Sequence, residues 1–160
     1  MRLTNQDQGT RWENRVCQYL TAELPPPASK TERISRTAQT GSRDRGDLTA
    51  RPFSLECKDQ ARHSVPAWLR QADAGSRAAA MPYSAVVVKI RGRRTGLAQV
   101  AISIRTFTRL RMLLGLDTTM AAVGYGFRVS LRGLDTSRWY MVCDLETFAV
   151  LLQDVRDARR

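Results

Sequence analysis

The 160-residue chain has few of the residues that mark disulfide-rich or zinc-binding proteins. Its three cysteines, Cys17, Cys57 and Cys143, are far apart and form no Cys-x-x-Cys pair. They therefore indicate buried thiols and exclude a disulfide framework or a cysteine zinc site. His63 is the single histidine. Any bound metal is therefore expected to have carboxylate ligands, which suit magnesium or manganese.

Long hydrophobic runs are also missing from the sequence. No apolar stretch approaches the ~18 residues that a membrane-spanning helix needs. The first six residues lack the apolar core of a signal peptide. A hydrophobic fraction of 42% still supports a folded core. We therefore expect one domain without membrane contact, located in the cytoplasm of a bacterium or of a phage-infected host cell.

Acidic residues are scarce relative to basic ones. The chain has 26 lysines and arginines against 15 aspartates and glutamates, a formal net charge of +11. Such an excess favours a polyanionic partner, most often nucleic acid. Only Lys30, Lys58 and Lys89 are lysines, and the other basic residues are arginines. Any lysine is therefore notable, because its compact ammonium is a tunable point charge, which a guanidinium is not.

Patterns in the first 96 residues predict alternating helices and strands. A helix is expected over residues 10–24, with Thr10 and Glu13 at capping-box spacing and Pro25 ending it. A strand is expected over 31–37, and two strands, 47–51 and 53–59, should form a hairpin joined at Arg51-Pro52. A helix over 64–80, with Ser64 as N-cap, and a continuously apolar strand over 84–90 complete this part.

Residues 97–160 contain a weak internal repeat. Two segments, around 100–107 and 140–148, each predict a strand, an N-cap (Ser103 or Asp144) and an apolar helix. Two copies are too few for a solenoid. The whole chain is therefore predicted to be an α/β fold with a central mixed β-sheet flanked by helices. We expect residues 1–96 to form the core and 97–160 a C-terminal strand–helix extension packed on the same domain.

The hairpin carries the candidate catalytic residues. Period-two alternation places Glu56 and Lys58 on one face of the second strand. The pairing of the two strands should bring Asp47 close to Glu56. Two carboxylates suit a hard divalent cation that keeps some of its waters. Lys58 could then orient the attacking water or stabilise charge on a phosphoryl group, and Glu13 could complete the site from the first helix.

This arrangement resembles the PD-(D/E)xK nuclease superfamily. Asp47 matches the acidic residue at a strand start, and Glu56-Cys57-Lys58 matches the (D/E)-x-K element. Gly46 is a departure, since the superfamily is named for a proline at that position. Gly9 and Glu13, followed by a basic strand and a Gly-Ser loop, make the chain most similar to archaeal-type and phage Holliday junction resolvases.

The resemblance implies a restriction-endonuclease-like nuclease core over residues 1–96. It also implies a Mg²⁺- or Mn²⁺-dependent endonuclease that cuts phosphodiester bonds in four-way or otherwise branched DNA, as in DNA recombination and repair. Glu13, Asp47, Glu56 and Lys58 would be catalytic, and Asp47, Glu56 and Glu13 would bind metal. A C2 homodimer would supply the two symmetric nicks that a junction requires. The expected nucleic-acid-binding residues are Arg33, Arg36, Ser42, Arg43, Arg45, Arg62, Arg91, Arg93 and Arg94.

Simpler interpretations remain open at this point. The chain could be another endonuclease of the same superfamily, of restriction or repair type, or a DNA-binding module without catalysis. Glu13 could only cap its helix, and Asp47 could be a turn residue. Glu56 and Lys58 could lie on a solvated strand face. Gln71, on the second predicted helix, could face the site or be ordinary surface.

Overall fold

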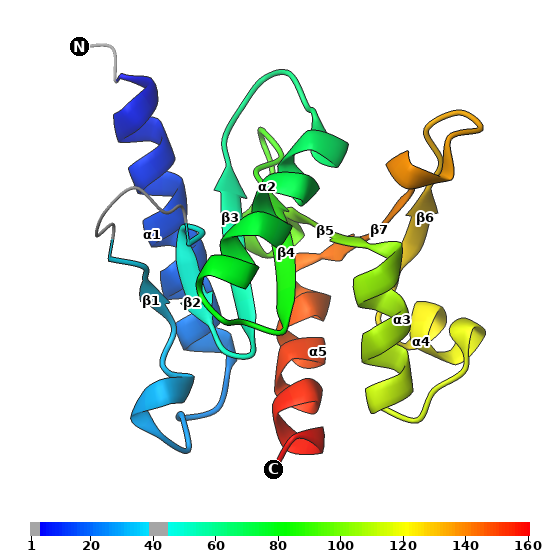
Figure 1. Cartoon of the computed structure of the whole chain (residues 1–160). Coiled ribbons are helices and arrows are strands. Elements are labelled where there is room, and N and C mark those ends of the chain that lie inside the picture. The colour runs from blue at the N-terminus through cyan, green and yellow to red at the C-terminus, as the bar shows by residue number, and fades with distance from the viewer. Residues whose placement is uncertain (1–3, 39–44) are drawn as a thin grey trace.

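The computed structural model describes residues 4–38 and 45–160. In these ranges the chain is an α/β fold in which a mixed sheet is flanked by helices (Figure 1). The strand order is β1-β2-β3-β4-β5-β7-β6. The helices are α1 (Asn5–Glu23), α2 (Val65–Ala78), α3 (Ile104–Leu113), α4 (Thr118–Gly124) and α5 (Leu145–Ala158). The strands are β1 (Ser35–Arg36), β2 (Leu48–Ala50), β3 (Phe53–Lys58), β4 (Tyr83–Val88), β5 (Gln99–Ser103), β6 (Arg128–Ser130) and β7 (Tyr140–Asp144).

The predicted hairpin is confirmed. Strands β2 and β3 pair antiparallel, with Leu48 opposite Leu55 and Ala50 opposite Phe53. Strand β4 then runs parallel to β3, with Glu56 beside Val86 and Lys58 beside Val88. Parallel strands need a long crossover connection, usually a helix, and α2 provides it here. The carboxyl ends of β3 and β4 therefore meet at one edge of the sheet.

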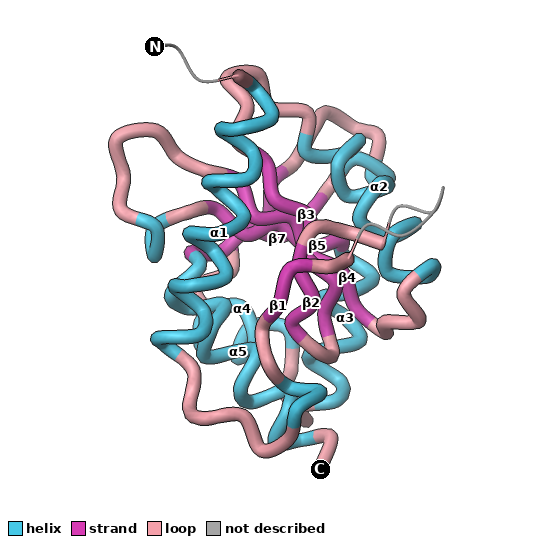
Figure 2. Tube along the Cα trace, turned by 90° about the vertical axis from the view of Figure 1, so that its left-hand side faces the viewer, coloured by secondary structure: helices cyan, strands magenta, loops and turns pink. Residues whose placement is uncertain are grey.

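The two faces of the sheet are covered by different helices. On one face, α1 and α5 pack against alternate residues of the central strands, including Leu55, Cys57 and Val87. On the other face, α2 packs Trp68 and neighbouring apolar residues against Val86 and Val88. Figure 2 shows α1 and α5 to one side of the strands and α2 to the other. Strand β4 is buried along its whole length, as its apolar run predicts.

The start of α1 differs from the prediction. The helix begins at Asn5, and the capping box is formed by Thr4 and Asp7 instead of Thr10 and Glu13. The Asp7 backbone N–H donates to Thr4 Oγ1 at 3.1 Å, and the Thr4 N–H donates to Asp7 Oδ2 at 3.2 Å. Both pairs have the required spacing of three residues, and Asp replaces the usual Glu at the third helical position. Glu13 therefore lies inside the helix and does not cap it.

The strand predicted over residues 31–37 is mostly wrong. Only Ser35–Arg36 forms strand β1, and Lys30–Glu32 is a turn of 3₁₀ helix. The Glu32 carboxylate accepts a hydrogen bond from the Ala28 N–H at 3.0 Å, which closes this turn. Such side-chain bonds compete with strand pairing, and the alternation of residue types does not reveal them.

Residues 97–160 contribute three of the seven strands that the structure describes in this sheet. Strand β5 pairs with β4, and β7 pairs with β5. Ser103 caps α3 by accepting the Thr106 N–H at 3.1 Å, and Asp144 occupies the N-cap of α5.

Within the described ranges, no helix has the length and apolarity needed to cross a membrane.

An aromatic contact joins the two halves of the sequence. Phe53 is fully buried, and its ring lies 5.1 Å from Phe148 of α5 and 5.2 Å from Tyr83 of β4. We expect Phe53→Ala to lower the free energy of unfolding by about 3–5 kcal/mol, because it leaves a cavity where these elements meet. Chemical denaturation followed by circular dichroism measures this change.

The matched control is Leu134→Ala, because the Leu134 side chain is 98% exposed. Its effect should stay within about 0.5 kcal/mol. Both variants should unfold in one transition. A second transition, or equal effects of the two substitutions, would contradict the shared core.

Candidate active site

Asp47 is positioned by the backbone at the start of the hairpin. Its N–H donates to the Leu55 carbonyl at 2.9 Å, which continues the ladder beyond Leu48. Its carboxylate Oδ2 in turn accepts the Cys57 N–H at 2.7 Å. Asp47 is therefore held beside residues 55–57 of the neighbouring strand, as the hairpin predicts.

Gly46, the residue before Asp47, has a backbone conformation that favours glycine. Its φ is +81°, a left-handed conformation that favours glycine. A Cβ atom at this position would also collide with Ser54 Oγ. Proline, whose ring holds φ near about −65°, could not adopt this conformation. A glycine instead of a proline at position 46 thus has a physical cause in this chain.

Glu56 and Lys58 form an ion pair beneath α2. Lys58 Nζ lies 2.7 Å from Glu56 Oε1 and donates to Gln71 Oε1 at 3.0 Å. Glu56 is only 4% exposed, so the alternative of a solvated strand face is wrong for this residue. Gln71 lies at the site, reaching it from α2. Its position on the helix does not distinguish the site from ordinary surface, and the sequence does not identify Lys58 as its partner.

Glu13 projects from α1 and contacts strand β1. Its Oε2 accepts from Arg36 Nε at 3.1 Å and from Arg36 Nη2 at 2.7 Å. These two hydrogen bonds hold the Glu13 carboxylate against β1. They also give Arg36, a predicted DNA-binding residue, an ion-pair partner within the protein. No local pattern indicates this pair, because 23 positions separate the two residues.

Cys57 lies between Glu56 and Lys58 in β3, with its buried thiol in the core on the α1 side of the sheet. Burial raises its pKa well above the ordinary value, and the charges of Asp47, Glu13 and Glu56 raise the pKa further. Lys58 acts in the opposite direction. The contacts that join the predicted catalytic residues are those of the Asp47 carboxylate with the Cys57 N–H and of Lys58 with Glu56, whereas Glu13 contacts Arg36.

The carboxylates do not form a complete metal cage. Within the described ranges, no group of three or more His, Cys, Asp and Glu side chains is placed to hold a metal ion. Magnesium does not need such a cage, because it commonly binds through one or two carboxylates and keeps several waters. Asp47 and Glu56, adjacent across the hairpin, fit this requirement by donor type. Glu13 is engaged with Arg36 instead.

The predicted nucleic-acid-binding residues fall into four groups. Arg45, Arg62, Arg91 and Arg93 are exposed in segments that precede β2 or follow the carboxyl ends of β3 and β4. Arg36 and Arg94 pair with Glu13 and with Glu146, the latter at 2.8 Å. Arg33 lies near Leu24 and Pro27, at the other end of α1 from the candidate site. Ser42 and Arg43 lie outside the described residues.

The buried ion pair gives a testable energetic prediction. Lys58→Met leaves the buried Glu56 carboxylate without its cation and should destabilise the fold by about 3–5 kcal/mol. The double variant Glu56→Gln/Lys58→Met removes both charges and should recover more than about 1 kcal/mol of that loss. Urea unfolding of wild type, both single variants and the double variant measures the coupling. Strictly additive effects would show that the pair is not a stabilising unit.

Comparisons with protein-family models, with curated protein sequences and with solved structures gave no match for this chain. The functional assignment therefore depends on the geometry of this site and on the motif resemblance.

Proposed function

We propose that this protein is a metal-dependent endonuclease that cuts branched DNA, and specifically a four-way junction resolvase of the PD-(D/E)xK type. The observation that carries the proposal is the position of Asp47 directly beside Glu56-Cys57-Lys58. Asp47 lies immediately before β2 and Glu56-Cys57-Lys58 lies in β3, and the hydrogen bond from Cys57 N–H to Asp47 Oδ2 joins the two segments. Glu13 lies on α1, where its carboxylate pairs with Arg36, and the resemblance assigns it to the same site.

Asp47 and Glu56 are the residues that would hold Mg²⁺ or Mn²⁺. When bound, the ion would neutralise phosphate charge and lower the pKa of a coordinated water. The backbone N–H of Cys57 keeps one oxygen of Asp47 oriented in the site. Burial of Glu56 excludes water and lowers the local dielectric, which strengthens the attraction between its carboxylate and a cation.

Lys58 is the residue proposed to act on the reacting atoms. Glu56 and Gln71 hold its ammonium from two directions, so its position is fixed before substrate binds. An ammonium in this position can donate a hydrogen bond to the attacking water or to a non-bridging phosphate oxygen. Fixed donors of this kind stabilise developing negative charge without reorganising during the reaction.

Exposed arginines at the same end of the sheet support a polyanionic substrate. Arg62 lies in the β3–α2 connection, and Arg91 and Arg93 lie in the turn after β4. Figure 1 shows both connections at the end of the sheet where α1 begins. Their charge would attract the DNA backbone to the carboxylates. We further propose a C2 homodimer, since two symmetric nicks require two sites at a fixed spacing.

A DNA-binding module without catalysis is the second candidate. It is favoured by the internal partners of two predicted metal ligands, because Glu13 pairs with Arg36 and Glu56 pairs with Lys58. In that case the carboxylates would stabilise the fold only, and the basic surface would still bind DNA.

The test compares cleavage of a labelled four-way junction and a matched linear duplex, with and without Mg²⁺. Wild type should nick the junction only when Mg²⁺ is present. Asp47→Asn should abolish cleavage and leave junction binding largely intact. Lys58→Ala should lower the single-turnover rate by about 10²-fold or more, as the loss of one fixed charge-stabilising donor does.

Lys30→Ala is the matched control, because Lys30 is an exposed lysine of the turn before β1. It should cleave at the wild-type rate. Circular dichroism confirms that each variant is folded before its rate is interpreted. Binding of the junction without Mg²⁺-dependent cleavage by wild type would favour the non-catalytic module. Cleavage by Asp47→Asn at the wild-type rate would refute the assigned site.

A further inference from the structure

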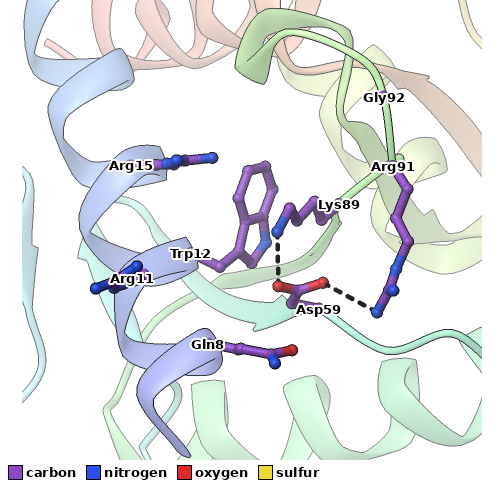
Figure 3. Close-up of a pocket in the computed structure, with 8 residues that line it drawn as sticks. All are labelled: Gln8, Arg11, Trp12, Arg15, Asp59, Lys89, Arg91 and Gly92. Atoms are coloured by element: carbon purple, nitrogen blue, oxygen red, sulfur yellow. Dashed lines mark hydrogen bonds and ion pairs between the residues drawn. The ribbon is translucent and has the colours of Figure 1, made fainter. Parts of the chain in front are cut away.

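A basic pocket lies between α1 and the segments that follow β3 and β4. It has a volume of about 390 Å³. Figure 3 shows side chains of α1 extending toward Lys89 and Asp59, with Arg91 on the far side. The lining residues are Gln8, Arg11, Trp12, Arg15, Asp59, Lys89, Arg91 and Gly92. Most of them are not among the residues proposed above to act in the endonuclease.

The α1 wall of the pocket follows from helical spacing. Gln8, Arg11, Trp12 and Arg15 follow i, i+3, i+4, i+7 spacing and therefore share one side of the helix. Trp12 is buried, and its indole N–H donates to the Val87 carbonyl at 3.2 Å. This bond fixes an apolar wall. Arg11 and Arg15 are exposed, and neither forms an ion pair within the described part of the chain.

The opposite wall is organised by a buried carboxylate. The Asp59 side chain is only 4% exposed, and it lies 2.7 Å from Lys89 Nζ and 3.9 Å from Arg91 Nη2. The Lys89 backbone N–H also donates to the Lys58 carbonyl at 2.9 Å. Asp59 therefore holds the Lys89 and Arg91 cations at the pocket. The pocket stays positively charged, because its lining includes four cationic side chains and one carboxylate.

The position of the pocket relates it to the candidate active site. In open α/β sheets, ligands commonly bind in the crevice beyond the carboxyl ends of parallel strands. Asp59 follows Lys58 directly at the end of β3, and their Cα atoms are about 3.8 Å apart across the peptide bond. Lys58 is bound to Gln71 on the α2 side, whereas Asp59 faces the pocket beside α1. A ligand in the pocket would therefore lie next to the end of the strand that carries the catalytic lysine.

We infer that this pocket binds a phosphate oxyanion of a nucleic-acid strand. Guanidinium groups donate paired hydrogen bonds that match phosphate oxygens. The pocket presents three of these groups and one ammonium beside a fixed indole wall. The choice of a nucleic acid as the bearer of the phosphate rests on the proposed function. The pocket would then anchor the strand beside the cleavage site.

The test uses the double variant Arg11→Ala/Arg15→Ala. These substitutions remove two exposed charges from a helix, and alanine favours the helix. The matched control is Arg128→Ala/Arg138→Ala, which removes two exposed arginines near the β6 edge, at the other end of the strand order. Binding of a short fluorescein-labelled DNA single strand is measured by anisotropy at several salt concentrations in EDTA, so that metal-dependent cleavage cannot contribute.

The pocket variant should weaken binding at least about tenfold more than the control. It should also flatten the slope of log affinity against log salt by about 0.7 for each phosphate released. Equal weakening by both double variants, or an unchanged slope in the pocket variant, would overturn the inference. Strands with a 5′-phosphate and with a 5′-hydroxyl distinguish the source of the oxyanion. A preference for the 5′-phosphate that the pocket variant loses identifies a terminal group, and equal binding of both strands identifies an internal phosphodiester.

The result of the pocket-binding test can be separated from the result of the cleavage test. If wild type binds DNA and shows no Mg²⁺-dependent cleavage, the catalytic proposal fails and the pocket test still stands. If wild type cleaves the junction and the pocket variant binds DNA as the control does, the pocket inference alone fails.

Discussion

The antiparallel pairing of β2 with β3 is the constraint on which the candidate site depends. Leu48 lies opposite Leu55, and the Asp47 N–H reaches the Leu55 carbonyl. Because side chains alternate along a strand, a slip of one residue would turn Glu56 and Lys58 to the opposite face. Burial of Leu48 and Leu55 in the core opposes such a slip. Gly46 adds a local constraint, since its left-handed backbone directs the chain into this pairing.

Helix α2 gives the site its second property, which is burial. It covers the face of the sheet that carries Glu56, and its Gln71 contacts the Lys58 ammonium. A buried carboxylate is costly unless a cation accompanies it, so Glu56 and Lys58 depend on each other for stability. The same low-dielectric setting would strengthen their interactions with a metal ion and a phosphate. The burial that makes the ion pair costly to disrupt would thus also favour interactions with a metal ion and a phosphate.

Local patterns in the sequence predicted the elements around the site, but not the contacts between them. The hairpin, the α2 region and buried strand β4 follow from alternation, turn residues and a continuous apolar run. The true start of α1 was missed because Thr4 and Asp7 have the same spacing as Thr10 and Glu13. Partners distant in sequence, such as Arg36 for Glu13 and Gln71 for Lys58, depend on packing that no local pattern encodes. The Asp59 carboxylate was overlooked because its partners come from the end of another strand.

Direct measurement of metal binding tests the central claim, that the β2–β3 pairing builds a carboxylate site for a divalent ion. Mn²⁺ is titrated into wild-type protein and into Asp47→Asn, and free Mn²⁺ is followed by electron paramagnetic resonance. Asp135→Asn is the control, because Asp135 is an exposed N-cap residue and asparagine also caps. The account predicts saturable binding that Asp47→Asn weakens at least about tenfold, equivalent to about 1.4 kcal/mol, and that Asp135→Asn leaves unchanged. Equal binding by wild type and Asp47→Asn, or no binding by wild type, would contradict it.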